Sequence, residues 1–360
     1  MNIKETDKMK VLVFGGTGAM GTHLVEMLSK SGISTVVTTR KNRPPRNNIK
    51  YLQGDAHEIS FLHTVLEEHW DAIIDFMVYR TEEFKERIEL LLGATSQYIF
   101  LSSARVYADS ESPITEESPR LLDVSKDQEF LSTDEYSLTK ARQENMLRDS
   151  EYKNWTIIRP YITYSEIRLQ LGVLEKEHWL YRALHGRTIV FSNDISSKFT
   201  TLTYGLDVAK GIFKIVGDAK AFGQVFHITT KDSYRWENIF SIYLDILEKR
   251  LEHRPKIMML DTALNLENRY LKYQVIYDRC FNRQFDNTKI EQFIDTDSFM
   301  KMESGLKKCM EIFLDNPQFD CINWRAEALK DRKTGERTPL SEISSIKQKI
   351  VYILYRYIIS

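Results

Sequence analysis

Hydrophobic residues in the first 160 positions gather in short runs rich in β-branched side chains. The stretches between these runs carry apolar residues at helical spacing. Strands are predicted over 10–14, 34–39, 49–53, 71–77, 97–103 and 155–160, and helices over 23–32, 59–69 and 82–93. Runs that are apolar throughout are typical of strands buried on both faces. The alternation therefore predicts an α/β fold with a doubly wound parallel sheet.

Beyond residue 160 the pattern is mixed and predicts a second, smaller lobe that is rich in helix. Strands are predicted over 187–191 and 223–229, and helices over 205–219 and 236–250. We divide the chain into a sheet domain (1–165, with 200–230 returning to it), a substrate lobe (166–199 and 231–335) and a C-terminal amphipathic helix (336–360). The stretch 104–134 has no clear period, and a loop of that length inside a domain is more often functional than idle.

The C-terminal segment has an apolar stripe at helical spacing with cations beside it. The stripe is formed by Ile346, Ile350, Ile353 or Leu354, and Tyr357, and the cations are Lys347, Lys349 and Arg356. Such a helix could dock on the body of the protein, join a dimer or lie on an anionic membrane surface. We expect docking or dimerisation ahead of a weak membrane contact.

Charge and composition exclude several classes of protein. The 360 residues carry 50 basic and 51 acidic side chains, so no overall positive charge favours nucleic acid as a partner. Cys280, Cys309 and Cys321 are far apart, and no His-Glu-x-x-His sequence is present, so neither a disulfide framework nor a metal site is expected. The polar start of the sequence and the lack of a long apolar run indicate a cytoplasmic protein.

The first predicted strand runs directly into a glycine-rich turn, "GGTGAMG" at 15–21. Glycines at this spacing allow a tight turn, a close approach of the backbone to a pyrophosphate and close packing of the next helix. The N-terminus of that helix favours negative charge. The turn therefore predicts a dinucleotide site with contacts from Gly15, Thr17, Gly18, Met20 and Gly21; the alternative is a tight turn with a structural role alone.

The residues at the end of the second predicted strand indicate which dinucleotide is bound. NAD sites usually place an acid there to hold the ribose 2′-hydroxyl. This strand ends with Thr39 and Arg40, and Lys41, Arg43 and Arg46 follow. Arg40 could hold a 2′-phosphate through charge-assisted hydrogen bonds. We therefore expect NADP, with NAD as the second possibility and a solvated basic loop as the structural alternative.

A tyrosine and a lysine four positions apart open another predicted helix, in "YSLTK". Tyr136 and Lys140 share one face of that helix and can both point into the cleft at the carboxyl ends of the strands. A nearby cation lowers the pKa of a phenol, which would bring Tyr136 closer to use as a general acid and base. Ser103, at the end of the fifth strand, could hydrogen-bond the reacting oxygen.

These motifs together resemble one family. "VFGGTGAMG", "GDA" at 54–56, "FLSSARVYA", "YSLTK" and "IIRPYITY" occur in the order and spacing of the extended short-chain dehydrogenase/reductases, in particular the NAD-dependent epimerase/dehydratase group that acts on nucleotide sugars. The resemblance covers about the first 230 residues and implies a Rossmann domain, a small substrate lobe and a homodimer. It implies Ser103, Tyr136 and Lys140 as the catalytic residues. It also implies cofactor contacts from Asp55, Ala56, Phe76, Met77, Tyr136, Lys140 and Pro160 to Ile162.

The same resemblance narrows the reaction. Sugar dehydratases of the group place an Asp–Glu pair directly after the serine, whereas this chain has Ala104 and Arg105. Dehydration is therefore disfavoured, and an epimerase or a 4-ketoreductase stays open. For the diphosphate of a nucleotide sugar the candidate cations are Arg182, Lys198 and Arg235, together with Arg187, with ordinary surface charge as the alternative. Peripheral membrane contact would suit polysaccharide biosynthesis.

The competing class is a protein that keeps the dinucleotide fold without catalysis. Some relatives lose the tyrosine and the lysine and act as redox sensors or RNA-binding proteins. Tyr136 and Lys140 are both present here, and the net charge is −1. The sequence therefore favours an enzyme with no nucleic-acid partner. The segment 277–293, in which aromatic and basic residues alternate, is expected to pack with one or two substrate contacts.

Overall fold

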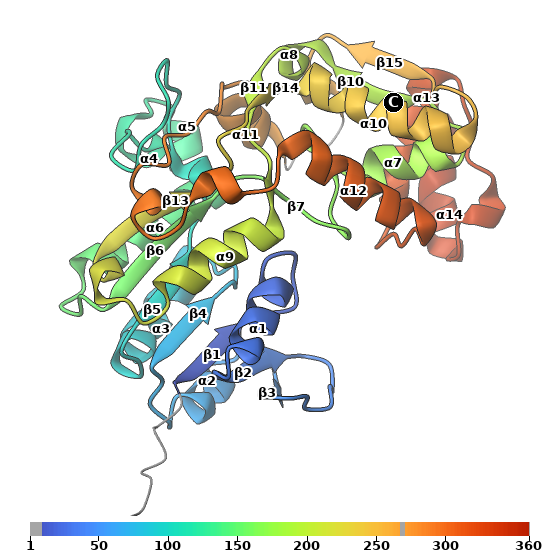
Figure 1. Cartoon of the computed structure of the whole chain (residues 1–360). Helices are drawn as coiled ribbons and strands as arrows, with labels where there is room; N and C mark the ends of the chain where they lie inside the picture. Colours follow the sequence, from blue (N-terminus) through green and yellow to red (C-terminus); the bar gives the residue numbers. More distant parts are fainter. Residues whose placement is uncertain (1–8, 267–270, 360) are drawn as a thin grey trace, which may run out of the picture.

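The apolar runs of the first half of the chain form one parallel sheet. A computed structural model describes residues 9–266 and 271–359 (Figure 1). Seven strands lie in the order β13-β6-β5-β4-β1-β2-β3, and every pair is parallel. Their bounds are β1 Lys10–Phe14, β2 Ser34–Thr39, β3 Ile49–Gln53, β4 Ala72–Asp75, β5 Tyr98–Leu101, β6 Trp155–Pro160 and β13 Gln224–Ile228.

Helices cover both faces of this sheet. On one face α1 (Gly21–Lys30) and α9 (Gly205–Ile215) bury residues such as Leu24 and Ile212 against the strands. On the other face α2 (Ile59–Val65), α3 (Thr81–Gly93) and α6 (Tyr136–Asp149) pack around residues such as Phe84. The predicted doubly wound α/β fold is confirmed.

Two of the predicted strands are shorter than their apolar runs. β4 ends at Asp75 and β5 at Leu101, although the runs continue to 77 and 103. Asp75 accepts hydrogen bonds from the Tyr79 and Tyr98 hydroxyls at 3.0 and 2.8 Å and from the Met77 N–H at 2.9 Å. The Phe76 and Ser102 N–H groups still donate to the Phe14 and Ile158 carbonyl oxygens of neighbouring strands, and beyond them the chain turns into the space above the sheet.

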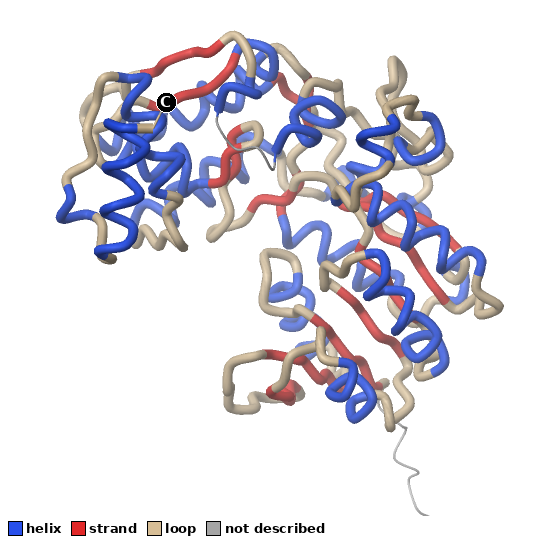
Figure 2. Tube along the Cα trace, turned by 180° about the vertical axis from the view of Figure 1, so that it is seen from behind, coloured by secondary structure: helices blue, strands red, loops and turns tan. Residues whose placement is uncertain are grey.

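The second lobe lies beyond the carboxyl ends of the strands (Figures 1 and 2). Its helices are α7 Lys176–Leu184, α8 Asn193–Ser196, α10 Trp236–Leu251, α11 Lys272–Gln274, α12 Met302–Asp315, α13 Trp324–Thr334 and α14 Ile346–Ile353. Short strand pairs connect them: β7 Thr163–Tyr164 with β12 Thr203–Tyr204, β8 Gln170–Leu171 with β9 Leu174–Glu175, β10 Ile189–Ser192 with β15 Ile257–Leu260, and β11 Phe199–Thr200 with β14 Tyr234–Arg235. The lobe has its own core, which includes Trp179, Trp236 and Tyr243.

The stretch 104–134 contains only short helical turns, η1 Ala104–Val106, α4 Leu121–Val124 and α5 Gln128–Leu131. It packs on α6 through Leu121 and Phe130, which are buried with Leu138. The expected long loop is therefore present and is held on the helix that carries Tyr136.

A buried cluster of charges ties α7 to the C-terminal part of the lobe. The Arg182 guanidinium contacts Glu327, Asp331 and Glu336 at 2.9, 2.8 and 2.9 Å. Arg187 pairs with Glu342 at 2.9 Å. Arg182, Glu327 and Asp331 have fully buried side chains. This cluster is structural, and it engages two of the cations that the sequence suggested for substrate binding, Arg182 and Arg187.

The chain ends in a helix that docks on α13. The helix α14 continues into a π-helical turn, η9, over Leu354–Ile358. Tyr352 is buried and donates its hydroxyl hydrogen to Asp331 at 2.7 Å. Ile346, Ile350 and Tyr357 of the predicted stripe face outward instead. Within the described ranges, no helix has the length and apolar character needed to cross a membrane.

Replacing Arg182 by methionine is expected to destabilise the fold. The change would leave the carboxylates of Glu327 and Asp331 buried with less compensation, and breaking such a cluster costs about 3–5 kcal/mol. The measurement is the free energy of unfolding in urea. The control is Arg254→Met, because Arg254 forms exposed pairs with Asp245 and Glu248, which contribute less than about 1 kcal/mol each. Equal stability losses in the two variants would contradict the structural role of Arg182.

Candidate active site

A cavity of about 470 Å³ lies between the carboxyl ends of the strands and the second lobe. The sheet domain contributes the residues that follow β4, β5 and β6, and α6 contributes its first turn. From the candidates of the sequence, the cavity is lined by Met20, Phe76, Met77, Ser103, Tyr136, Lys140, Pro160 and Ile162. The full lining comes from seven separate parts of the chain, including 168–175 and 271–279 of the second lobe. These parts meet at the edge of a parallel sheet where ligands of such folds bind.

The helix α6 begins at Tyr136 because Glu135 caps its N-terminus. The Glu135 carboxylate accepts a hydrogen bond from the Ser137 N–H at 2.7 Å. One turn later, the Lys140 side chain is almost fully buried, and its ammonium donates to the Met77 carbonyl oxygen at 3.3 Å. The same ammonium lies 4.5 Å from the centre of the Phe100 ring. The helix thus carries Tyr136 and Lys140 into one cavity, as their spacing predicted.

Burial raises the pKa of the Tyr136 phenol, and the Arg105 charge and a hydrogen bond with Ser103 oppose that rise. The Arg105 guanidinium lies 5.2 Å from the centre of the Tyr136 ring. The same guanidinium forms an ion pair with the Glu135 carboxylate at 2.5 Å. The expected lowering of this pKa is therefore not observed. The cation that acts most on the phenol is Arg105, which the sequence analysis considered only as a departure from the dehydratase pattern.

Burial lowers the pKa of Lys140 to about 8, and the charges of Asp75 and Glu144 act in the opposite direction. Asp75 is itself completely buried, and burial raises the pKa of its carboxyl group. Lys140 can therefore lose its proton much nearer to neutral pH than an exposed lysine does.

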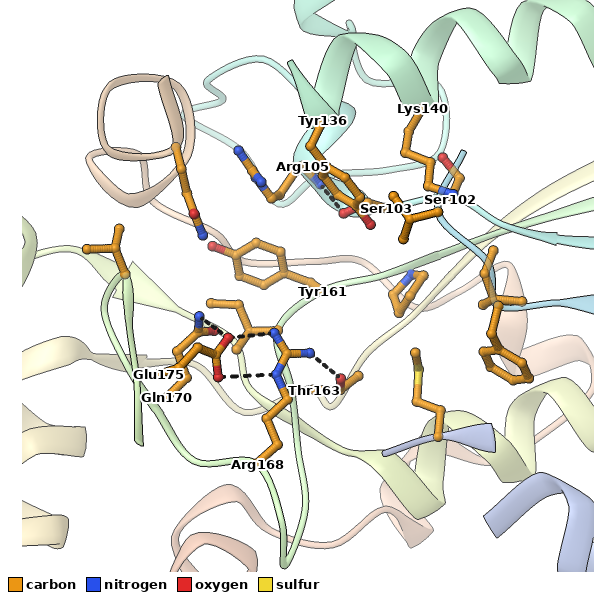
Figure 3. Close-up of a pocket in the computed structure, with 18 of the residues that line it drawn as sticks. Ser102, Ser103, Arg105, Tyr136, Lys140, Tyr161, Thr163, Arg168, Gln170 and Glu175 are labelled. Carbon is orange, nitrogen blue, oxygen red and sulfur yellow. Dashed lines mark hydrogen bonds and ion pairs between the residues drawn. The ribbon is translucent and has the colours of Figure 1, made fainter. Parts of the chain in front are cut away.

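The opposite wall of the cavity comes from the second lobe (Figure 3). Arg168 pairs with Glu175 at 3.0 Å, and Gln170 donates to the same carboxylate at 3.0 Å. Arg279 also lines the cavity, where it donates to the Gly172 carbonyl oxygen at 3.0 Å. This wall therefore presents two guanidinium groups, one amide and one carboxylate opposite the phenol of Tyr136.

The sequence analysis missed most of this wall. Arg168 and Gln170 lie between β6 and α7, in a segment without a periodic pattern. Arg279 belongs to the segment 277–293, whose alternating aromatic and basic residues were the available signal.

A second cavity of about 410 Å³ lies beside the glycine turn. Gly15 and Thr17 line it from the turn, and Arg40, Lys41 and Arg43 line it from the end of β2. The loop after β3 contributes Asp55 and Ala56, and Met77 lines this cavity as well as the first. Within the described part of the chain, no carboxylate forms an ion pair with Arg40. Met77 is thus the residue that the two cavities share, and both cavities lie at the carboxyl ends of the parallel strands.

The glycine turn between them fits a pyrophosphate. Gly15 has a φ of +67°, which favours glycine, and a Cβ on Gly21 would lie 2.7 Å from the Gly16 Cα. Gly18 has no protein atom within 4 Å of an added Cβ, so its backbone is open to a ligand. The N-terminus of α1 has no side-chain cap and no acid in its first turn. These residues suit a dianionic bridge between the two cavities.

The four predicted substrate cations, Arg182, Arg187, Lys198 and Arg235, lie outside both cavities. Arg182 is engaged in the buried cluster with Glu327 and Asp331. Arg235 is exposed, and its guanidinium lies 5.1 Å from the centre of the Phe199 ring. Lys198 is partly exposed beside α8. The structure brings the cofactor and catalytic candidates together, but it does not bring these cations to them.

Two known proteins align with parts of this chain. The chloroplast stem-loop binding protein of 41 kDa b from Arabidopsis thaliana is 27 % identical over 246 residues, which are 63 % of this chain and 60 % of the relative. UDP-glucose 4-epimerase from Neisseria gonorrhoeae is 26 % identical over 181 residues, or 42 % of this chain and 51 % of the relative. The chain thus spans between half and two thirds of the length of these relatives.

Among solved structures, the UDP-glucuronic acid 4-epimerase of Bacillus cereus, in complex with UDP-glucuronic acid and NAD, has a similar fold. The TM-score is 0.63 at 16 % identity, over 85 % of this chain and 99 % of that one. The family model of the NAD dependent epimerase/dehydratase family matches residues 11–228. The match includes the glycine turn, Ser103, Tyr136 and Lys140, and it confirms the resemblance noted in the sequence. The chain belongs to the NAD dependent epimerase/dehydratase family.

Proposed function

We propose that this protein is an NAD(P)-dependent oxidoreductase that acts on a nucleotide sugar, as an epimerase or a 4-ketoreductase. One observation carries the proposal: Ser103, Tyr136 and Lys140 line a single cavity that Met77 connects to the site beside the glycine turn. A dinucleotide laid across the turn would have one end beside Tyr136 and the other beside Arg40.

The Tyr136 hydroxyl is the group that would move a proton at the sugar oxygen. It lies in the cavity and forms a hydrogen bond with Ser103, which could hold the same oxygen in place. The dinucleotide, when bound, supplies the hydride exchange. The Arg105 charge favours the phenolate, so it would ease removal of the proton from a sugar hydroxyl.

Lys140 is suited to hold a ribose hydroxyl of the cofactor and to exchange a proton with it. Its ammonium is buried at the carbonyl oxygen of Met77, a residue that lines both cavities. With a pKa near 8, the group can both donate and accept a proton close to neutral pH.

The cavity supports epimerisation or ketone reduction over dehydration. Water elimination needs a free acid and a free base beside the serine, where this chain has Ala104 and Arg105. The nearby Glu135 is bound to Arg105, and Glu175 is bound to Arg168. The 4-epimerases among the similar proteins support an epimerase.

The choice between NADP and NAD rests on Arg40. Arg40 and Lys41 line the cavity at the end of β2, where a carboxylate would repel a 2′-phosphate. This arrangement supports NADP and, with it, a reductase. The similar solved structure holds NAD, which supports a retained NAD and an epimerase.

A catalytically silent role as a redox sensor or RNA-binding protein is the alternative. The name of the Arabidopsis relative, a stem-loop binding protein, favours this alternative. The presence of Tyr136 and Lys140 in one cavity and the net charge of −1 favour the enzyme.

Replacing Tyr136 by phenylalanine separates the two roles. The variant should bind dinucleotide as the parent does but lose about 100- to 10,000-fold in kcat, because the proton-transfer group is gone. Conversion of a panel of nucleotide sugars and their 4-keto forms, with NAD and NADPH, is followed by NMR. Turnover that survives the substitution would contradict the role of Tyr136, and no turnover of any sugar by the parent protein would contradict the enzyme.

The buried charge of Lys140 predicts a pH-dependent cost in stability. Because its pKa of about 8 in the folded chain is below the ordinary lysine value of 10.5, the cost is fully present below pH 8 and fades as the pH rises to 10.5. Relative to Lys140→Met, the parent should therefore gain up to about 2–3 kcal/mol in unfolding free energy between pH 7 and pH 10. A stability difference that stays constant with pH would contradict the lowered pKa. Lys153→Met, at an exposed lysine, serves as the control.

Replacing Arg40 by alanine tests the cofactor preference. The variant should lose about 10- to 100-fold in affinity for NADP and little for NAD, since only the 2′-phosphate pairs with the guanidinium. Kd values from fluorescence titration check this, with Lys50→Ala on β3 as a control outside the cavity. Equal losses for both dinucleotides would contradict a 2′-phosphate site at Arg40.

A further inference from the structure

The last helix of the chain exposes a row of large apolar side chains. We define the C-terminal stripe as Ile346, Ile350, Ile353, Tyr357 and Ile358, which are 76, 54, 36, 56 and 69 % exposed. The opposite side of the same helix is fixed, because Tyr352 is buried and bonded to Asp331. The stripe is therefore held outward by a docked helix and has a defined orientation.

The charges around the stripe have one sign. Residues 343–360 include Lys347, Lys349 and Arg356 but no aspartate or glutamate. Exposed cations on and after α13 add to them, namely Arg325, Arg332 and Arg337. The acids of this region point inward: those of α13 and of the segment before α14 bind buried cations, in the pairs Arg182–Glu327, Arg182–Asp331, Arg182–Glu336 and Arg187–Glu342. The buried cluster thus leaves the outer surface basic.

We propose that the C-terminal stripe lies on the surface of a membrane that contains anionic lipid. An apolar stripe flanked by lysine and arginine, with no acid on the helix, matches the chemistry of an interfacial helix. The apolar side chains would enter the boundary between headgroups and acyl chains, and the cations would contact the negative headgroups. Such a helix lies in the membrane surface and does not cross the bilayer.

A second copy of this chain fits the stripe less well. A two-fold interface would place the stripe against itself, because such an interface uses the same patch of both copies. Lys347, Lys349 and Arg356 would then face their own copies with no carboxylate on the helix to compensate them. The headgroups of an anionic lipid surface supply the negative charge that a second copy does not.

The position of the helix is compatible with this contact. In both views α14 lies at the outer end of the second lobe, away from the seven-stranded sheet (Figures 1 and 2). The residues of the stripe line neither of the two cavities. Contact through the stripe would therefore leave the cavities accessible, and the proposal does not depend on the reaction catalysed.

Co-sedimentation of the full chain with vesicles tests the proposal. Vesicles of phosphatidylcholine alone are compared with vesicles that also contain phosphatidylglycerol, at low and high salt. Binding to the anionic vesicles should be at least about tenfold stronger, and salt should weaken it, because several cations contribute. Absence of binding to either vesicle, or equal binding to both, would overturn the proposal.

Two pairs of variants locate the contact. Binding should weaken by about tenfold or more in each of two double variants. One combines Ile350→Ser with Tyr357→Ser, and the other combines Lys347→Glu with Lys349→Glu. The matched controls are Ile312→Ser on α12 and Lys249→Glu on α10, which are also exposed, and they should bind as the parent does. Thermal unfolding checks that each variant is folded. Equal binding by test and control variants would overturn the proposal, as would a dimer in sedimentation equilibrium that Ile350→Ser dissociates.

Discussion

The paired Glu144 carboxylate and Arg159 guanidinium fix the helix on which the candidate site depends. Both side chains are fully buried, and two hydrogen bonds of 2.8 and 2.6 Å join them. Ser102, at the end of β5, donates to the same carboxylate at 2.6 Å. Arg159 holds the pKa of Glu144 below its ordinary value in spite of burial. A buried charge of this kind is stable only with its partner, so β5, β6 and α6 are held together at one point.

Glu144 lies four residues after Lys140 and eight after Tyr136, so all three share one face of α6. The contact that fixes the rotation of the helix therefore also aims the phenol and the ammonium at the cavity. The Glu144 carboxylate also binds the hydroxyl of Ser102. Ser102 directly precedes Ser103, which is the third residue of the candidate site. Positioning and chemistry thus depend on three polar residues that recur every four positions along α6.

Much of the fold could be predicted because inner strands of the sheet such as β1, β4 and β5 are buried on both faces and appear as apolar runs. The strand ends could not be predicted in this way, since β4 ends at Asp75, whose carboxylate accepts hydrogen bonds from the Tyr79 and Tyr98 hydroxyls. The sequence placed Tyr136 and Lys140 on one helix face, but it could not show that Arg105 would lie over the phenol. Spacing along a helix reports local geometry, whereas the Arg105 contact depends on how β5 and α6 pack.

The predicted substrate cations also show that sequence spacing does not reveal contacts made by tertiary packing. Arg182 appears in the sequence as an ordinary charge on a helix, and only the packing of α7 on α13 turns it into the centre of a buried cluster. The apolar stripe of the last helix was expected to face the body or a second copy. Docking instead uses Tyr352, which has a hydroxyl that can reach the buried Asp331, and the isoleucines remain outside.

We propose that α6 presents Tyr136 and Lys140 to a dinucleotide that spans both cavities. A crystal structure of the protein with NADP or NAD tests this most directly. We predict the pyrophosphate on the turn 15–21, the adenosine beside Arg40 and Asp55, and the nicotinamide ring in contact with the Tyr136 hydroxyl. A dinucleotide bound with its nicotinamide ring outside this cavity, or no binding of either dinucleotide, would contradict it.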